Sequence, residues 1–206
     1  MRTIFTIVCL LITPNLPAPT IAYQSNEICA GVTDEPIEQC AEICETVCTS
    51  RHFDLLVPFV MLSEGFEATA YPDGYTSKGK RRYSYGYGTK APHSNATITQ
   101  PKAAELLVQH LERLCFHETL TVLDDHWQRM VLVSSLYNLG SFGPNLQKSI
   151  RANDTYLMQQ SLQLYVNFNG EPLAGLVTRR ARECRLLAMT TEQAENYIKT
   201  LEDGQN

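Results

Sequence analysis

The sequence predicts an α+β fold in which a small sheet-bearing lobe is joined by a long helix to a larger helical lobe. Two observations support this prediction. Residues 70–90 combine a turn signal, Pro72-Asp73-Gly74, with a stretch at 83–88 that alternates aromatic and small residues, as strands often do. From Thr99 onward, apolar residues recur at helical spacing. A small sheet followed by a run of helices is typical of an α+β domain.

The elements follow from local signals along the chain. A mostly apolar run at 53–62 predicts a buried helix that ends near Gly65, and residues 70–90 predict a small hairpin or a three-stranded sheet. Thr99 as N-cap and Pro101 in the first turn predict the long helix, which should reach about residue 117. Further helices are expected from 124 or 125 to about 140, and at 146–151, 154–165, 176–188 and 191–201.

Composition and charge exclude several classes of protein. The chain has 206 residues, of which 44% are hydrophobic and 19% are charged, and these values are those of a globular protein rather than a disordered one. The net charge of -5 provides no general basic field, so we expect no nucleic-acid partner. Basic residues do gather in two places, and each group is either a solvated face or the lining of a cleft for an anionic polymer. The groups are Lys78, Lys80, Arg81, Arg82 and Lys90, and Arg179, Arg180, Arg182 and Arg185.

Residues 1–22 resemble a secretory signal peptide. Met1-Arg2 provides a positive start, residues 4–12 are apolar except for Thr6, and small residues precede Tyr23. Nine residues are too few to cross a bilayer as a helix, which takes about 20. We therefore expect a secreted or periplasmic protein with no stable membrane insertion after cleavage, and a retained anchor is the alternative.

Six cysteines remain after the signal, and an even number in an exported chain favours disulfides. Cys40, Cys44 and Cys48 share one face of a short predicted helix, where neighbours are poorly placed to bridge each other. At least two of them should therefore pair with Cys29, Cys115 or Cys184. A metal site is the alternative, but no histidine ligand pattern accompanies the cysteines. Residues 23–50 thus form a cysteine-rich extension, either a disulfide staple or a regulatory or targeting element.

Two acidic residues and a serine provide candidate chemistry. Glu64 closes an apolar helix, and burial there would raise the pKa of a carboxyl toward the value that a general acid needs. Asp73 lies in a polar turn and should stay ionised, while Ser84, on a strand returning past Asp73, offers a hydroxyl that can orient water. Singly, these residues are an ordinary solvated carboxylate, a turn residue and a polar filler. Together, two carboxylates with separated proton affinities indicate cleavage of a glycosidic bond.

Three segments then resemble one family. Residues 63–73 (SEGFEATAYPD) followed by 83–89 (YSYGYGT) are similar to the active-site signature of phage-type lysozymes, the endolysins of glycoside hydrolase family 24. In that family eight residues separate a glutamate at the end of the first helix from an aspartate or cysteine, as they separate Glu64 from Asp73. Residues 127–140 resemble the central helix of the family, and 175–183 (GLVTRRARE) its late Gly-Leu-x-x-Arg-Arg-x-x-Glu stretch. The resemblance covers about residues 53–190.

The sequence also departs from this pattern. Ser84 stands where threonine is usual, and Thr89 where many members have histidine. Ten residues lie between Asp73 and Ser84, a longer hairpin than usual, which leaves open how the two side chains meet.

The resemblance implies a lysozyme-like catalytic domain at 51–206 that hydrolyses the β-1,4 bond between N-acetylmuramic acid and N-acetylglucosamine, with inversion. Glu64 would be the general acid, Asp73 the water-positioning carboxylate and Ser84 a residue that orients the water. Tyr87 and Asn138 are predicted substrate-binding residues, with helix C-capping as the alternative role of Asn138. The expected partner is a peptidoglycan glycan strand, and we expect a monomer without cofactor or metal.

Other functions have less support. The five histidines show no metal-ligand motif and no Gly-x-Ser-x-Gly elbow occurs, so a zinc peptidase and a serine hydrolase are disfavoured. A lytic transglycosylase would need Glu64 but could dispense with Asp73. The remaining alternative is a non-catalytic cell-wall-binding protein that keeps the lysozyme fold. Sequons at Asn95 and Asn153 matter only in a eukaryotic secretory route.

Overall fold

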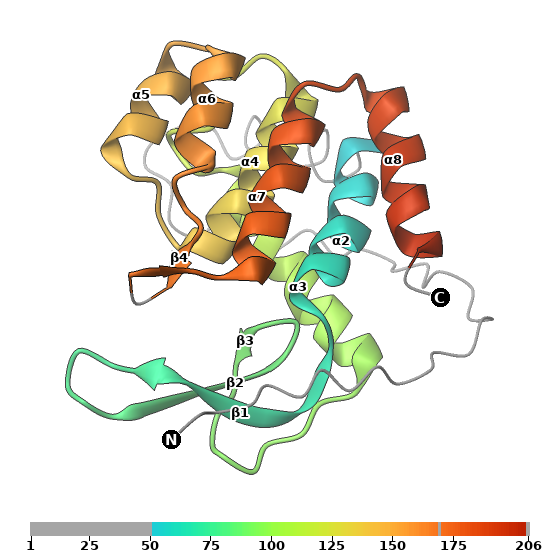
Figure 1. The fold of residues 1–206 in the computed structure, drawn as a ribbon. Helices are drawn as coiled ribbons and strands as arrows, with labels where there is room; N and C mark the ends of the chain where they lie inside the picture. Colours follow the sequence, from blue (N-terminus) through green and yellow to red (C-terminus); the bar gives the residue numbers. More distant parts are fainter. Residues whose placement is uncertain (1–50, 169, 205–206) are drawn as a thin grey trace, which may run out of the picture.

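The computed structural model describes residues 51–168 and 170–204, which form two lobes (Figure 1). The predicted signal segment at 1–22 and the cysteine-rich extension at 23–50 lie outside the described residues. The described part has seven helices, a three-stranded antiparallel sheet in the order β1-β2-β3, and a two-stranded β4-β5 hairpin. The helices are α2 (Arg51–Glu64), α3 (Gln100–Cys115), α4 (His126–Leu139), α5 (Pro144–Arg151), α6 (Thr155–Leu162), α7 (Ala174–Leu187) and α8 (Thr191–Asp203). The strands are β1 (Glu67–Tyr75), β2 (Arg81–Gly86), β3 (Thr89–Lys90), β4 (Asn167–Phe168) and β5 (Glu171–Pro172).

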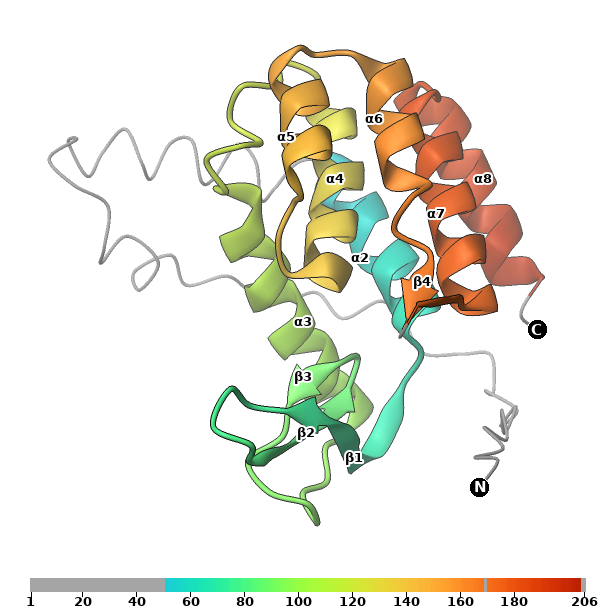
Figure 2. The same ribbon diagram turned by 60° about the vertical axis from the view of Figure 1, so that its left-hand side comes forward.

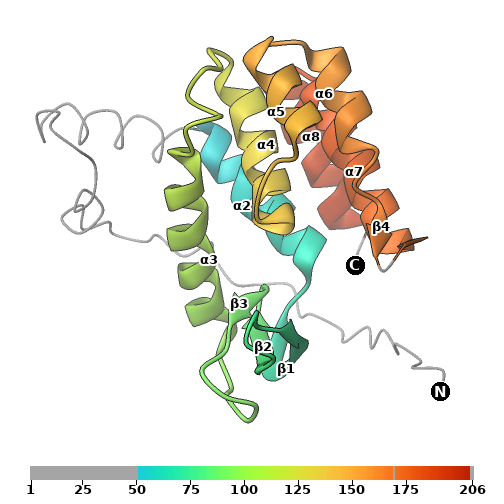
Figure 3. The same cartoon turned by 90° about the vertical axis from the view of Figure 1, so that its left-hand side faces the viewer.

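The arrangement confirms the predicted α+β architecture. The small sheet lies at one end of the molecule, and α3 runs from beside the sheet into the helical lobe (Figures 2 and 3). Proline stands in the first turn of α3, as predicted. Thr99 occupies the N-cap position, but its side chain accepts no capping hydrogen bond, so the predicted cap is only positional. The β4-β5 hairpin is absent from the sequence-based prediction, because two-residue strands leave almost no periodic signal.

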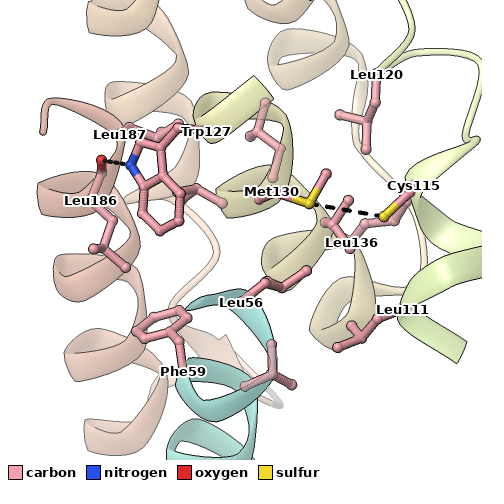
Figure 4. Close-up of a cluster of buried hydrophobic side chains, with 14 of the residues drawn as sticks. Leu56, Phe59, Leu111, Cys115, Leu120, Trp127, Met130, Leu136, Leu186 and Leu187 are labelled. Atoms are coloured by element: carbon pink, nitrogen blue, oxygen red, sulfur yellow. Dashed lines mark hydrogen bonds between the residues drawn. The ribbon is translucent and has the colours of Figure 1, made fainter. Parts of the chain in front are cut away.

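The core lies in the helical lobe around α4 (Figure 4). Every residue from Met130 to Leu136 is buried, so α4 is apolar on nearly all sides and is enclosed by other helices. Leu56 and Phe59 of α2 pack into this core, and the indole nitrogen of Trp127 donates to the Leu186 carbonyl at 2.9 Å. Helix α2 packs against α4, so the core holds the C-terminal end of α2 in place.

The sheet corrects one prediction about Pro72-Asp73-Gly74. These residues do not form a turn but lie inside β1, where Pro72 pairs with Tyr83 and Tyr75 with Arg81. Asp73 and Gly74 therefore both lie opposite Arg82, an irregularity of the β-bulge type. The chain turns later, at residues 76–80, so Pro-Asp-Gly chemistry serves here to bend a strand rather than to reverse it.

The described part of the chain contains no disulfide. Cys115 and Cys184 are both buried, and burial raises the pKa of the Cys184 thiol to about 11. Its sulfur donates to the Gln159 carbonyl at 3.4 Å. The other four cysteines of the predicted disulfides lie outside the described residues. The predicted pairing of Cys40, Cys44 and Cys48 therefore stays a prediction.

Two further searches cover the described residues only. None of the helices there is both long and apolar enough to span a bilayer. No group of three or more histidine, cysteine, aspartate or glutamate side chains in that part is arranged to hold a metal ion.

Gly86 provides a test of how the sheet packs on α3. Its φ of +61° favours glycine, and a Cβ at this position would lie 2.8 Å from the Cβ of Ala103 on α3. We predict that Gly86→Ala lowers the free energy of unfolding by about 1–3 kcal/mol more than Gly140→Ala does, as measured by urea denaturation. Gly140 is the matched control because it has a φ of +74°, whereas a Cβ there would meet no atom within 4 Å. Equal losses in the two variants would contradict the close packing of β2 on α3.

Candidate functional site

Glu64 is the last residue of α2, and a buried arginine holds its carboxylate. The helix ends because Gly65 adopts a left-handed conformation with φ of +72°, and its amide donates to the Met61 carbonyl at 3.0 Å. Glu64 Oε1 accepts a hydrogen bond from Nη1 of Arg179, on α7. The Glu64 side chain is 18% exposed and that of Arg179 only 5%. The carboxylate thus reaches the surface while one of its oxygens is fixed from the interior.

Arg179 is itself fixed by buried groups of the helical lobe. Its Nε lies 3.1 Å from Oε1 of Glu183, and its Nη2 donates to the Ser134 carbonyl at 3.1 Å. The Ser134 hydroxyl donates to the same Glu183 oxygen at 2.9 Å. Burial lowers the pKa of Arg179, but the charges of Glu64 and Glu183 raise it by more. Because both carboxylates compensate it, the buried guanidinium of Arg179 stays charged.

This network corrects the sequence-based interpretation of the second basic cluster. Arg179 and Arg180 are buried, so they form neither a solvated face nor a cationic surface. Arg180 Nη1 pairs with Oε2 of Glu183 at 2.9 Å, while its Nη2 donates to Oδ1 of Asn138 at 2.7 Å. The spacing of Glu183 three and four residues after the arginines was the available signal for these ion pairs.

Asp73 and Ser84 meet across the β1-β2 pair despite the long hairpin. The Ser84 hydroxyl donates to Oδ2 of Asp73 at 2.6 Å. Ser84 is only 3% exposed, whereas Asp73 is exposed. The backbone carbonyl of Asp73 accepts from Nε of Arg82 at 3.2 Å, which secures the bulge. The bulge and the serine together give Asp73 one fixed oxygen.

Tyr71 shows that the two carboxylates share one region. Burial raises the pKa of the Tyr71 hydroxyl, and the negative charges of Asp73, Glu64 and Glu67, in that order, raise it further. The charges of both candidate carboxylates therefore act on the same phenol. The Tyr71 side chain is 39% exposed, so it lines an accessible surface beside them. Sequence reasoning missed it, although it stands two residues before Asp73 and pairs with Ser84.

Tyr137 and Gly88 lie beside Glu64. The Tyr137 hydroxyl donates to the Tyr87 carbonyl at 2.6 Å, and burial together with the Glu64 charge raises the pKa of Tyr137 to about 12. A Cβ at Gly88 would lie 3.6 Å from Glu64 Oε2 and 3.7 Å from the Tyr137 hydroxyl. Gly88, with φ of +89°, therefore lets the turn between β2 and β3 approach the carboxylate closely.

The two predicted substrate-binding residues are less exposed than Tyr71 and Asp73. Tyr87 is 4% exposed, its ring packs against Phe66 at a centroid distance of 5.6 Å, and its hydroxyl accepts from Gln100 at 3.1 Å. Its side chain therefore offers almost no surface to a ligand. Asn138 is half-buried and binds Arg180, while Gly140 provides the left-handed C-cap of α4.

The comparisons with known proteins place this site in a family. Residues 62–183, more than half of the chain, match the family described as phage lysozyme. The chain belongs to the phage lysozyme family. It is accordingly a glycoside hydrolase that degrades peptidoglycan. The matched residues include Glu64, Asp73 and Ser84 and end at Glu183 of the buried network.

Solved structures of phage lysozyme type have the same fold. The muramidase domain of SpmX from Asticcacaulis excentricus is 24% identical with a TM-score of 0.55, over 68% of this chain and 97% of that domain. An endolysin from Escherichia coli O157:H7 phage FAHEc1 is 22% identical with a TM-score of 0.50, over 68% of this chain and 92% of its own. The active form of the P1 phage endolysin Lyz is 18% identical with a TM-score of 0.53, over 74% and 93% of the two chains. No curated protein matches the sequence.

The buried network gives a prediction on stability. Arg179→Met leaves Glu183 and Glu64 without their shared cation, so we expect the free energy of unfolding to fall by about 3–5 kcal/mol in a urea titration. Arg182→Met is the control on the same helix, because Arg182 is partly exposed, and its loss should stay within about 0.5 kcal/mol. Equal stability of the two variants would show that the ion pairs of Arg179 do not stabilise the fold.

Proposed function

We propose that this lysozyme hydrolyses the β-1,4 bond between N-acetylmuramic acid and N-acetylglucosamine, with Glu64 as general acid and Asp73 as the carboxylate that positions water. The observation that carries the proposal is the contrast between the two acids beside Tyr71. One is partly buried and held by an internal arginine, and the other is exposed and held by a serine. A pair of carboxylates in different surroundings is what glycoside hydrolysis requires.

The geometry suggests which oxygen of Glu64 acts. Arg179 donates to Oε1, and Oε2 is the oxygen that lies toward Gly88 and Tyr137. A protonated Glu64 can keep the bond from Arg179 on Oε1 while Oε2 carries the proton. We therefore assign proton transfer to Oε2, which gives its proton to the glycosidic oxygen as the bond from that oxygen to the anomeric carbon breaks.

Asp73 supplies the second half of the reaction. Its Oδ2 accepts from Ser84, which leaves Oδ1 to accept a hydrogen bond from a water molecule. As the water oxygen bonds to the anomeric carbon, its proton passes to Asp73. Because Ser84 is only 3% exposed, we assign it a positioning role through Asp73 rather than direct contact with the water. Attack by a water on the face opposite the leaving group inverts the configuration.

This function fits the expected location of the chain. A hydrolase that degrades the cell wall must reach it, which agrees with the predicted signal peptide and with a secreted or periplasmic location. The predicted disulfides belong to the same environment.

Substitution of Glu64 tests the proposal directly. We predict that Glu64→Gln slows release of muropeptides from sacculi by about 10²–10⁴-fold, because the amide has no proton to donate. Glu67→Gln is the control, since Glu67 is an exposed acid on the adjacent strand, and it should keep close to the parent rate.

The outcome distinguishes the alternatives. Equal rates for Glu64→Gln and the parent chain would remove Glu64 from the mechanism. A parent chain that binds sacculi but releases no muropeptides would instead identify a non-catalytic wall-binding protein.

A further inference from the structure

The small sheet carries a charge opposite to that of the whole chain. From β1 to β3 it has five basic and two acidic residues, a net charge of +3 in a protein of net charge -5. The next acid along the chain after Asp73 is Glu105, on α3. All five basic side chains are exposed, and they are Lys78, Lys80, Arg81, Arg82 and Lys90. Charge segregation of this kind orients a protein toward an anionic partner.

Three of these basic residues lie at the end of the β1-β2 hairpin and form no ion pair with other described residues. Arg82 binds the Asp73 carbonyl and so serves the bulge. Within the described ranges, no carboxylate lies at salt-bridge distance from Lys78, Lys80 or Arg81. We call these three residues the basic tip.

The turn that carries the basic tip is well formed. The Thr76 amide donates to the Lys80 carbonyl at 2.8 Å, and the Lys80 amide donates to the Thr76 hydroxyl at 3.0 Å. Gly79 adopts a φ of +74°, and its amide donates to the Thr76 carbonyl at 2.9 Å. These bonds fix the backbone of the turn, and with it the direction in which the basic tip projects.

The basic tip is continuous with the candidate site. Asp73 lies on β1 only three residues before Thr76, which is about 10 Å along a strand. The hairpin extends away from the rest of the molecule (Figure 1). Tyr75, between the site and the tip, is 65% exposed. A polymer bound at Asp73 and continuing along the hairpin therefore meets an exposed aromatic ring and then the three cations.

We propose that the basic tip binds the carboxylates of the stem peptides that the muramic acid residues of the glycan carry. This inference rests on the proposed function, because the glycan must lie beside Asp73 for its peptides to reach the tip. Stem peptides repeat along the strand and have free carboxylates, with which arginine and lysine pair well. The rest of the chain is acidic and would be repelled by such a substrate, so the tip also selects the orientation of approach.

The test removes the three charges in the full-length chain, as Lys78→Ala, Lys80→Ala and Arg81→Ala together. On intact sacculi at low salt we expect KM to rise about 3- to 150-fold, the range for three exposed ion pairs, with kcat unchanged. An amidase strips the stem peptides and leaves one lactyl carboxylate on each muramic acid, close to the sugar ring. On such stripped strands the KM of the tip variant should stay close to that of the parent chain, because the carboxylates that reach the tip are gone. The difference on sacculi should shrink as salt is added.

A matched control removes three exposed basic residues of the helical lobe, as Lys148→Ala, Arg151→Ala and Lys199→Ala. It changes the net charge equally, and we expect much less effect on KM for sacculi. An equal effect would show that only total charge matters and would overturn the proposal. An unchanged KM of the tip variant on sacculi, or an equal rise on stripped strands, would also overturn it.

A binding assay separates this proposal from the proposed function. If the parent chain cuts neither substrate, the proposed function fails, and pelleting with sacculi still tests the tip. The proposal expects the tip variant to pellet less with intact sacculi but equally with stripped ones. Tip-dependent pelleting with vesicles of anionic phospholipid, and none with sacculi, would assign the tip to a membrane surface and contradict the proposal.

Discussion

The hydrogen-bonded ion pair between Arg179 and Glu64 is the interaction on which the site depends. It joins residues 115 positions apart, one at the end of α2 and the other inside α7. Arg179 is held by Glu183 and by the Ser134 carbonyl of α4, the most enclosed helix of the core. The direction of the Glu64 carboxyl is therefore set by the whole helical lobe rather than by the helix end alone. The proposed role of Glu64 as general acid requires such support, because small misplacements of a catalytic group cost much of the rate.

The sheet holds the second acid by a different device. A bulge at Asp73 and Gly74 turns the carboxylate toward Ser84, and the exposed position of Asp73 keeps it in contact with water. The negative charges of both acids act on Tyr71, whose side chain is exposed. The fold thus places the two acids in different surroundings: the interior holds the Glu64 carboxyl, and the Asp73 carboxyl remains solvated.

Much of this arrangement could be predicted from the sequence, because its signals are local. Helical periodicity and the aromatic-glycine alternation predicted the lobes, and α4 begins at His126, next to its predicted start at 124 or 125. Pro72-Asp73-Gly74 was misinterpreted because a turn and a bulge use the same residues, and only the strand register distinguishes them. The burial of Tyr87, a predicted substrate-binding residue, could not be predicted, since strand residues alternate and the sequence does not say which face is covered. The burial of Arg179 beside Glu64 has no local signal, since its partner comes from a distant helix.

A double-mutant cycle on Glu64 and Arg179 tests the central claim most directly. The free energy of unfolding would be measured by urea denaturation for the parent chain, Glu64→Gln, Arg179→Met and the double variant. A hydrogen bond between charged partners predicts a coupling energy of about 1.5–3 kcal/mol. Additive losses, with a coupling near zero, would show that Arg179 does not hold Glu64 and would contradict this account of the site.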